Sequence, residues 1–231
     1  MMKTIGLLGG TGWESTQEYY RIINEKISKA TNNVHTAQIV MFSVDFNDVR
    51  SRIDRNDYES LGHFFAEKAL GVEKHGADCL LLCANTPHMF ADAISLQLSI
   101  PLIHIADATG ERIQRKNMGK VALLGTRPTM EMPFYTQRLK EKFGIEVVTP
   151  LPAVRDYVHN TIYNEFTRGI FTAEAKARYL EIIQELAHQG VGGIIMGCTE
   201  IPLLINQSDT NILLFDTLQI HAEAAVEFAL K

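Results

Sequence analysis

The segment Ile5-Gly6-Leu7-Leu8-Gly9-Gly10-Thr11 has a counterpart in the second half of the chain, Val121-Ala122-Leu123-Leu124-Gly125-Thr126-Arg127. A second pair, residues 80–88 (LLLCANTPH) and 194–201 (IIMGCTEI), repeats the pattern of an apolar run that ends in small and polar residues. In both pairs the two copies are separated by about half of the 231 residues. The sequence therefore predicts two copies of one α/β unit, with chance similarity between glycine-terminated strands as the alternative.

Short apolar runs alternate with helix-like stretches along the chain. The strand candidates, short and mostly apolar like buried parallel strands, are Thr4–Leu8, Ala37–Val44, Cys79–Cys83, Leu102–Ile105, Val121–Leu124, Glu146–Thr149, Gly193–Met196 and Ile212–Leu214. The helix candidates, with apolar residues at spacings of three and four, are Trp13–Ala30, Tyr58–His75, Asp107–Lys116, Met130–Phe143, Ala173–Gln189 and Leu218–Leu230. This βαβ succession predicts an α/β fold with parallel sheets.

Composition argues against several classes of protein. The apolar content of 46% is enough to bury a core, and the net charge of −5 without a basic cluster argues against a nucleic-acid partner. No uncharged run approaches the ~18 residues of a membrane span, so no membrane partner is expected. The run Ile5–Leu8 is too short for a secretion signal, and the three cysteines are expected to be free thiols in the cytoplasm.

Polar residues follow several predicted strands, at Gly9–Thr16, Ala84–His88, Thr126–Thr129 and Cys198–Glu200. Ligands of open parallel sheets bind beyond the carboxyl ends of the strands. Hydroxyls, amides and backbone N–H groups at helix starts favour an anion such as a carboxylate, with phosphate as the rival ligand. The run Gly9–Gly12 is similar to a dinucleotide-binding turn with Asp45 as the ribose acid, but its glycine spacing is irregular and Asp45 follows too far behind.

Other kinds of catalytic site find little support in the sequence. The eight histidines form no close pair with one another or with a cysteine, so no metal is expected. No Gly-x-Ser-x-Gly elbow is present, and Cys198 has no neighbouring base in the sequence. We also expect no organic cofactor.

Four motifs carry a resemblance to a known family: Gly-Gly-Thr-Gly-Trp-Glu-Ser-Thr (9–16), Asn-Thr-Pro-His (85–88), Gly-Thr-Arg-Pro-Thr-Met-Glu (125–131) and Gly-Cys-Thr-Glu (197–200). Through nearly its whole length the chain resembles the aspartate/glutamate racemase family. The resemblance implies two pseudo-symmetric flavodoxin-like domains with an active-site cleft between them, and often a homodimer without pyridoxal phosphate. The domains are expected at residues 1–100 with 208–231 and at 101–207, with the break near Ser99–Pro101.

In that family two cysteines, in a Cys-Asn-Thr and a Cys-Thr-Glu motif, remove and return a proton on opposite faces of the substrate α-carbon. Cys198 matches the second motif, whereas the match of Asn85 and Thr86 to the first places its cysteine at Ala84, whose methyl group exchanges no proton. Cys83 lies one residue early, and adjacent strand side chains point to opposite faces. At a strand-to-helix turn we expect a lowered pKa for the Cys198 thiol, with a buried structural cysteine as the alternative.

The remaining site residues are predicted from their chemistry. Gly10 and Thr11 would let the backbone approach a ligand, although a plain turn uses the same residues. Glu200 is expected to orient Cys198 or to bind the substrate ammonium, with a first-turn helix acid as the alternative. The uncharged donors suited to the α-carboxylate, for which helix capping is the alternative, are Asn85, Thr86, Thr126 and Thr199.

A side-chain carboxylate on the substrate would require a further cation. Arg50, Arg52 and Arg168 lie in stretches that we interpret as loops, and Arg52 and Arg168 are the predicted substrate-binding arginines. The resemblance implies an arginine and a lysine for this task in acidic-substrate members, but it does not align them with residues here. A solvated surface arginine is the alternative for each.

The sequence thus predicts a cofactor-independent racemase of aspartate, glutamate or a broader set of amino acids, impaired or one-sided because of Ala84. Its substrate would be a small amino acid or dicarboxylate. Two alternatives remain open: a single-cysteine decarboxylase of the arylmalonate type, and a catalytically degenerate carboxylate-binding protein. The polar Cys198 motif fits poorly with the apolar pocket that an arylmalonate decarboxylase needs.

Overall fold

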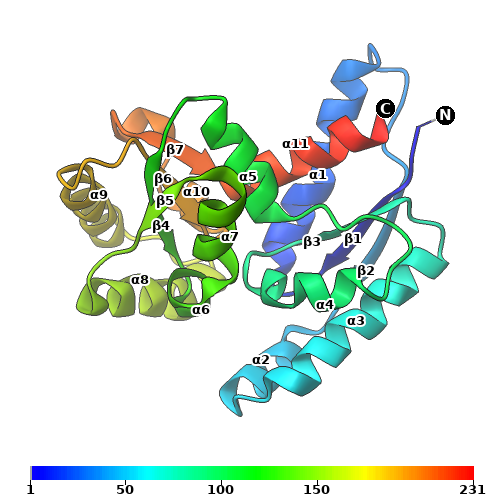
Figure 1. Ribbon diagram of the computed structural model, residues 1–231, viewed down its shortest axis with the longest axis horizontal. Coiled ribbons are helices and arrows are strands. Elements are labelled where there is room, and N and C mark those ends of the chain that lie inside the picture. Colours follow the sequence, from blue (N-terminus) through cyan, green and yellow to red (C-terminus); the bar gives the residue numbers. More distant parts are fainter. Residues whose placement is uncertain (1) are drawn as a thin grey trace. The chain divides into compact units, whose positions relative to one another are not determined.

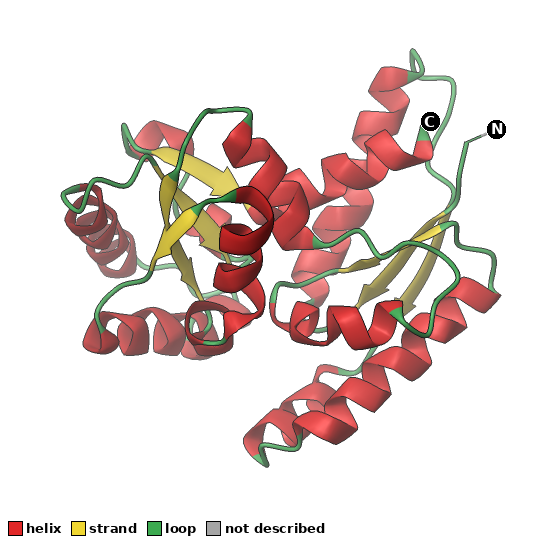
Figure 2. Ribbon diagram, viewed as in Figure 1, coloured by secondary structure: helices red, strands yellow, loops and turns green. Residues whose placement is uncertain are grey.

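The computed structural model describes residues 2–231 and divides the chain into two compact units (Figures 1 and 2). Unit 1 runs from the N-terminus to Ile105 and also contains Leu218–Lys231, whereas unit 2 is Ala106–Thr217. These boundaries lie later than the expected ones, for two reasons. Residues 101–103 pair with a strand of unit 1, and the strand near residue 214 joins the sheet of unit 2.

Unit 1 contains a three-stranded parallel sheet in the order β2-β1-β3. Its strands are β1 (Ile5–Gly9), β2 (Ile39–Ser43) and β3 (Cys79–Leu82). Every residue of β1 and β3 is buried, which explains why both are continuous apolar runs without alternation. Because Leu8 is in register with both Phe42 and Leu82, the carboxyl ends of the three strands lie at one edge.

Helices cover both faces of this sheet (Figure 1). On one face, α1 (Trp13–Ala30) and α11 (Thr217–Ala229) share an apolar core with Ile5, Leu7 and Cys83. On the other face, α3 (Tyr58–Lys74) packs against Leu8, Leu80 and Leu82. The shorter elements of this unit are α2 (Phe46–Asp54), η1 (Thr86–Phe90) and α4 (Ala91–Ser95).

Unit 2 contains a four-stranded parallel sheet in the order β5-β4-β6-β7. Its strands are β4 (Lys120–Gly125), β5 (Glu146–Val148), β6 (Gly193–Gly197) and β7 (Leu213–Asp216). The helices that accompany them are α5 (Ile105–Gln114), α6 (Arg127–Glu131), α7 (Pro133–Phe143), α8 (Pro152–Asn164), η2 (Phe166–Arg168), α9 (Ala173–Ala187), α10 (Ile201–Leu204) and η3 (Gln207–Asp209). The alternate residues Ala122, Leu124, Ile194 and Met196 face the core formed with α8 and α9.

The predicted α/β fold with parallel sheets is confirmed. In each unit the first strand is central, the second lies on one side and the third on the other, which is the start of the flavodoxin-like strand order. The two units therefore repeat one topology, as the paired segments of the sequence predicted.

The structure differs from the predicted elements in several places, and the longest of them is α8, a helix over Pro152–Asn164 where none was predicted. Leu102 makes only an isolated parallel bridge, to Leu80, and α5 already begins at Ile105. The helix expected over residues 130–143 is divided into α6 and α7, because Pro133 forces the preceding Met132 into an extended conformation. Residues 46–54, which we interpreted as a loop, form α2, with Asp45 as its N-cap. No helix within residues 2–231 is long and apolar enough to cross a membrane.

Unit 1 buries three histidines in one cluster, His88, His104 and His221. The ring of His88 lies 4.7 Å from that of His104 and 5.4 Å from that of His221, measured between centroids. His221 is held by the Tyr19 hydroxyl at 2.7 Å from Nδ1 and by the Ile103 carbonyl at 2.7 Å from Nε2. Burial lowers the pKa of His221 to about 4 and the pKa of His88 well below its ordinary value.

We expect acid to destabilise unit 1 through this cluster. Because the pKa of folded His221 is depressed, its stabilising contribution is complete above about pH 6.5 and is lost as the pH falls toward about 4, on the order of 3 kcal/mol. Urea unfolding at pH 7 and pH 4.5 should show a smaller loss of stability for His221→Gln than for the wild type. An equal pH dependence of the two proteins would contradict this assignment.

Candidate active site

Strands β4 and β6 end side by side, and Thr126 and Cys198 follow them. Gly125 is in register with Gly197, the last residue of β6. A Cβ atom on Gly125 would lie 2.8 Å from the carbonyl oxygen of Gly197, and one on Gly197 would lie 3.0 Å from that of Leu124. Both positions therefore require glycine, and the two polar strand ends leave the sheet at the same edge.

Cys198 is in contact with the carboxylate of Glu200. The Sγ atom of Cys198 lies 2.8 Å from Oε2 of Glu200, which also accepts a hydrogen bond from the Thr199 hydroxyl at 3.0 Å. The side chains of Cys198 and Glu200 are 8% and 7% exposed, so the pair is shielded from solvent. Of the two roles expected for Glu200, orienting Cys198 matches this contact. Thr199 gives its proton to Glu200, which conflicts with its expected role as a donor to a substrate carboxylate.

The expectation of a lowered Cys198 pKa is wrong for the chain by itself. Burial and the negative charge of Glu200 raise the pKa of the thiol well above its ordinary value. The helix that follows, α10, has four residues and supplies little dipole to stabilise a thiolate. The local pattern suggested a helix N-terminus, but burial and an adjacent carboxylate outweigh it.

In unit 1, the segment after β1 is held in a conformation that requires glycine. Gly10 has a φ of +95°, and a Cβ atom there would lie 2.1 Å from the carbonyl oxygen of Val44. Its N–H donates to Thr16 Oγ1 at 2.9 Å, so the first turn of α1 fixes the loop. The hydroxyl oxygen of Thr11 is buried and has no hydrogen-bond partner among residues 2–231, which is consistent with the predicted ligand contact.

Ala84, Asn85 and Thr86 follow β3 at the same edge of the unit 1 sheet as Gly10 and Thr11. Ala84 and Thr86 are partly exposed, and Asn85 is buried. Cys83 lies on the opposite side of the strand from Ala84, in the apolar core with Ile5 and Leu7, and burial raises the pKa of its thiol. Cys83 is therefore poorly placed to serve instead of a cysteine at position 84, where the sequence predicted the first cysteine of the family.

The two predicted arginines have different surroundings. Arg52 lies on α2 rather than in a loop, where its Nε donates to Ser60 Oγ at 3.1 Å and its guanidinium stacks over Phe64. These contacts and the nearby Asp48 occupy it, which argues against its predicted role. Arg168 ends η2 and is exposed, and its guanidinium has no hydrogen bond or ion pair with any residue of the described chain 2–231. Arg50 is paired with Asp54 at 3.6 Å.

Several residues that shape the site were not predicted individually. Thr129 packs over both Gly125 and Gly197 and lies 3.0 Å from the Thr126 hydroxyl, measured between the two Oγ1 atoms. Nδ1 of His159 accepts the backbone N–H of Arg127 at 3.2 Å. The hydroxyl of Ser15 donates to the Cys83 carbonyl at 3.2 Å. Thr129 and Ser15 fall inside the quoted motifs, whereas His159 carried no signal because its partner lies 32 residues away.

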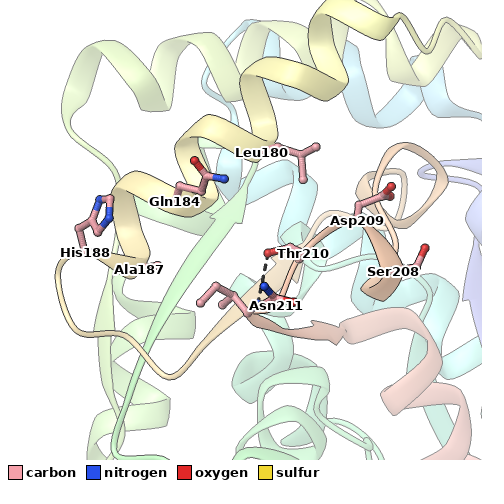
Figure 3. Close-up of a pocket in the computed structure, with 9 residues that line it drawn as sticks. Leu180, Gln184, Ala187, His188, Ser208, Asp209, Thr210 and Asn211 are labelled. Carbon is pink, nitrogen blue, oxygen red and sulfur yellow. Dashed lines mark hydrogen bonds between the residues drawn. The ribbon is translucent and has the colours of Figure 1, made fainter.

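A hollow of about 370 Å³ in unit 2 lies between the end of α9 and residues 208–212 (Figure 3). Leu180 and Gln184 of α9 face Asp209–Asn211 across it. The end of α9 precedes β6 and residues 208–212 precede β7, so this hollow is at the amino edge of the sheet. Cys198 follows the carboxyl end of β6, and the hollow is therefore not the candidate active site.

Within residues 2–231, no group of three or more histidine, cysteine, aspartate or glutamate side chains is arranged to hold a metal ion. The three cysteines are free thiols.

The Asp/Glu/hydantoin racemase family model matches residues 8–225. The chain belongs to this family. It is 24% identical to a broad specificity amino-acid racemase of Bacillus subtilis over 96% of each chain. Among solved structures, a candidate Asp/Glu racemase from Yersinia pestis is similar at 43% identity and a TM-score of 0.94, and each chain is covered completely. An aspartate racemase homologue from Pyrococcus horikoshii is 31% identical with a TM-score of 0.85, again over both complete chains.

A variant of arylmalonate decarboxylase shares the fold at 14% identity and a TM-score of 0.59, with 98% of this chain and 93% of that chain covered. At this identity the likeness concerns the fold alone. The matches of Cys198 and of Ala84 to the two cysteine positions of the family stay predictions.

The glycine pair should be intolerant of a methyl group. Gly125→Ala places a Cβ atom against the Gly197 carbonyl, so we expect the free energy of unfolding to fall by about 1–3 kcal/mol. Gly119→Ala, just before β4, is the matched control, because a Cβ atom there meets nothing within 4 Å. Urea unfolding measures both variants. Equal stability of the two would show that β4 and β6 can separate at no cost.

Proposed function

We propose that this chain is a cofactor-independent amino-acid racemase that acts on aspartate, glutamate or a broader set of amino acids through the Cys198 thiolate. The observation that carries the proposal is the buried contact between Cys198 and Glu200 at the end of β6. Membership of the racemase family and the similarity to a broad specificity amino-acid racemase support it. The homodimer and the cytoplasmic location remain predictions from the sequence.

Racemisation requires a base for a very weakly acidic proton. When a thiolate takes the α-proton, the electron pair remains on the substrate as an enediolate and must be stabilised by donors at the carboxylate. Return of a proton to the opposite face inverts the centre, whereas return to the same face only exchanges the proton. Exchange on one face needs only the base and these donors, whereas inversion also needs a second group that gives a proton to the opposite face.

The negative charge of Glu200 disfavours ionisation of Cys198, and binding of a substrate would offset this effect. Oε2 of Glu200 accepts from Cys198 and Thr199, which leaves Oε1 to pair with the substrate ammonium. That pairing neutralises the carboxylate and brings a positive charge near the sulfur, so the pKa of Cys198 falls when substrate is bound. The same residue thus keeps the thiol protonated in the free chain and allows its ionisation in the complex.

The hydroxyl pair of Thr126 and Thr129 lies beside Cys198 and is the proposed support for the α-carboxylate in unit 2. The two Oγ1 atoms lie 3.0 Å apart, so each hydroxyl helps to fix the position of the other. Thr11, Asn85 and Thr86 of unit 1 stay predicted carboxylate ligands. Arg168 is the remaining candidate for a side-chain carboxylate.

With Ala84 at the predicted position of the first cysteine, we expect the α-proton to exchange with solvent on one face of the α-carbon faster than the α-carbon is inverted. NMR of L- and D-aspartate and glutamate in D₂O should show α-deuteration of one enantiomer faster than racemisation. Ala84→Cys should raise racemisation by about 10²–10⁴-fold, the usual worth of a general acid/base. Cys198→Ala should abolish both processes.

Two results would contradict this prediction. Equal, fast racemisation of both enantiomers by the wild type would mean that another group serves the second face. Absence of exchange with any amino acid would instead favour a decarboxylase or a degenerate carboxylate-binding protein. The single thiol is compatible with a decarboxylase, but the Glu200 carboxylate beside it would repel a malonate-type dianion.

Replacing Glu200 should separate its two effects. In Glu200→Gln the charge that raises the Cys198 pKa is gone, so alkylation of free Cys198 by iodoacetamide at pH 8 should be faster than in the wild type. The KM for amino acids should rise in the same variant, because the ammonium loses its partner. Glu174→Gln, which removes an exposed carboxylate in the first turn of α9, is the matched control. Slower alkylation in Glu200→Gln would refute the electrostatic role.

A further inference from the structure

His88 joins the end of β3 to the beginning of α5. Its side chain is 2% exposed, and its Nδ1 atom lies 2.8 Å from the carbonyl oxygen of Ala84. The backbone N–H of Ile105 donates to Nε2 at 3.2 Å. His104 and His221 surround the ring.

The partners of His88 allow one tautomer only. A carbonyl oxygen accepts and does not donate, so Nδ1 carries the proton toward Ala84. A backbone N–H donates and does not accept, so Nε2 presents its lone pair to Ile105. Both nitrogens are thereby engaged, and the ring is neutral. His88 therefore has no free nitrogen with which to act as an acid or a base.

Three consecutive carbonyl groups at the end of β3 are tied down. The Ser15 hydroxyl is shared between the Gly12 carbonyl at 2.9 Å and that of Cys83 at 3.2 Å, the His88 side chain holds that of Ala84, and the His88 backbone N–H holds that of Asn85 at 3.1 Å. In a trans peptide the C=O and the following N–H point in opposite directions, so the His88 bond also sets the plane that carries the N–H of Asn85. Because these carbonyl oxygens are directed toward their hydrogen-bond donors, they do not point at a bound carboxylate and do not repel it.

We propose that His88 is a positioning residue for carboxylate binding: it fixes the Ala84–Asn85 peptide so that Asn85 and Thr86 meet the substrate's α-carboxylate in the correct orientation. This inference rests on the proposed function, because it takes these two residues as carboxylate ligands. His88 acts through them and does not touch the substrate. Its loss should therefore weaken substrate binding more than it slows the chemical step.

Three variants and one control test this role. His88→Leu removes both side-chain hydrogen bonds, and His88→Asn retains an amide donor near the place of Nδ1. His88→Gln reaches toward Ile105 instead. The control is His75→Asn, because Nδ1 of His75 makes the same type of bond, to the Gly71 carbonyl four residues earlier at 2.7 Å, on an exposed helix end.

The kinetic readout is α-proton exchange of glutamate and aspartate in D₂O. His88→Leu should raise KM by about 3- to 10-fold, the worth of a lost hydrogen bond, with kcat changed by less than about 3-fold. His88→Asn should restore KM toward the wild-type value, His88→Gln should not, and His75→Asn should change neither constant. Loss of kcat at an unchanged KM, or equal defects in His88→Asn and His88→Leu, would overturn the proposal.

Two measurements separate this proposal from the proposed function. Nitrogen-15 NMR of the wild type should show His88 protonated on Nδ1 and His221 protonated on Nε2, and the reverse tautomer of His88 would refute the inference. Amide hydrogen exchange at Asn85 and Thr86 should be faster in His88→Leu and His88→Gln, which lose the bond to the Ala84 carbonyl, than in the wild type, His88→Asn or His75→Asn, even if no amino acid is turned over. Unchanged exchange in both His88→Leu and His88→Gln would also refute it.

Discussion

The parallel pairing of β4 with β6 is the constraint on which the candidate active site depends. Gly125 and Gly197 lie opposite each other with no room for a methyl group, and Thr129 packs across the pair. This close approach brings Thr126 and Cys198 out of the sheet as neighbours. A side chain at either glycine would separate the strands, and the thiol would move away from its hydroxyl neighbours.

The contact between Cys198 and Glu200 places a negative charge where a catalytic thiol would normally be given a positive one. In the free chain, burial and this charge both favour the protonated thiol. Such a thiol is poorly nucleophilic, which protects it from oxidation and alkylation in the absence of substrate. Under the proposed function, the ammonium group common to all amino acids reverses the local charge, which agrees with a broad set of substrates more than with one side chain.

The two units reach a similar arrangement by different means. In unit 2 the strand end is shaped by a glycine pair and a short helix, whereas in unit 1 Ser15, Thr16 and His88 hold the loops through side-chain hydrogen bonds to the backbone. Buried polar side chains of this kind are costly unless every partner is present. The His88 and His221 contacts meet that condition, and both rings are held neutral by it.

The sequence alone determined the α/β fold, the repeated topology and the strand ends that carry polar residues. These follow from local periodicity and composition, which act over a few residues. Tertiary structure decided the direction of the Cys198 pKa, the engagement of Arg52 with Ser60 and Phe64, and the membership of β7 in unit 2. It also gave His88 its partner at Ile105, 17 residues away. Burial and pairing between distant segments control these properties, and neither has a local signature in the chain.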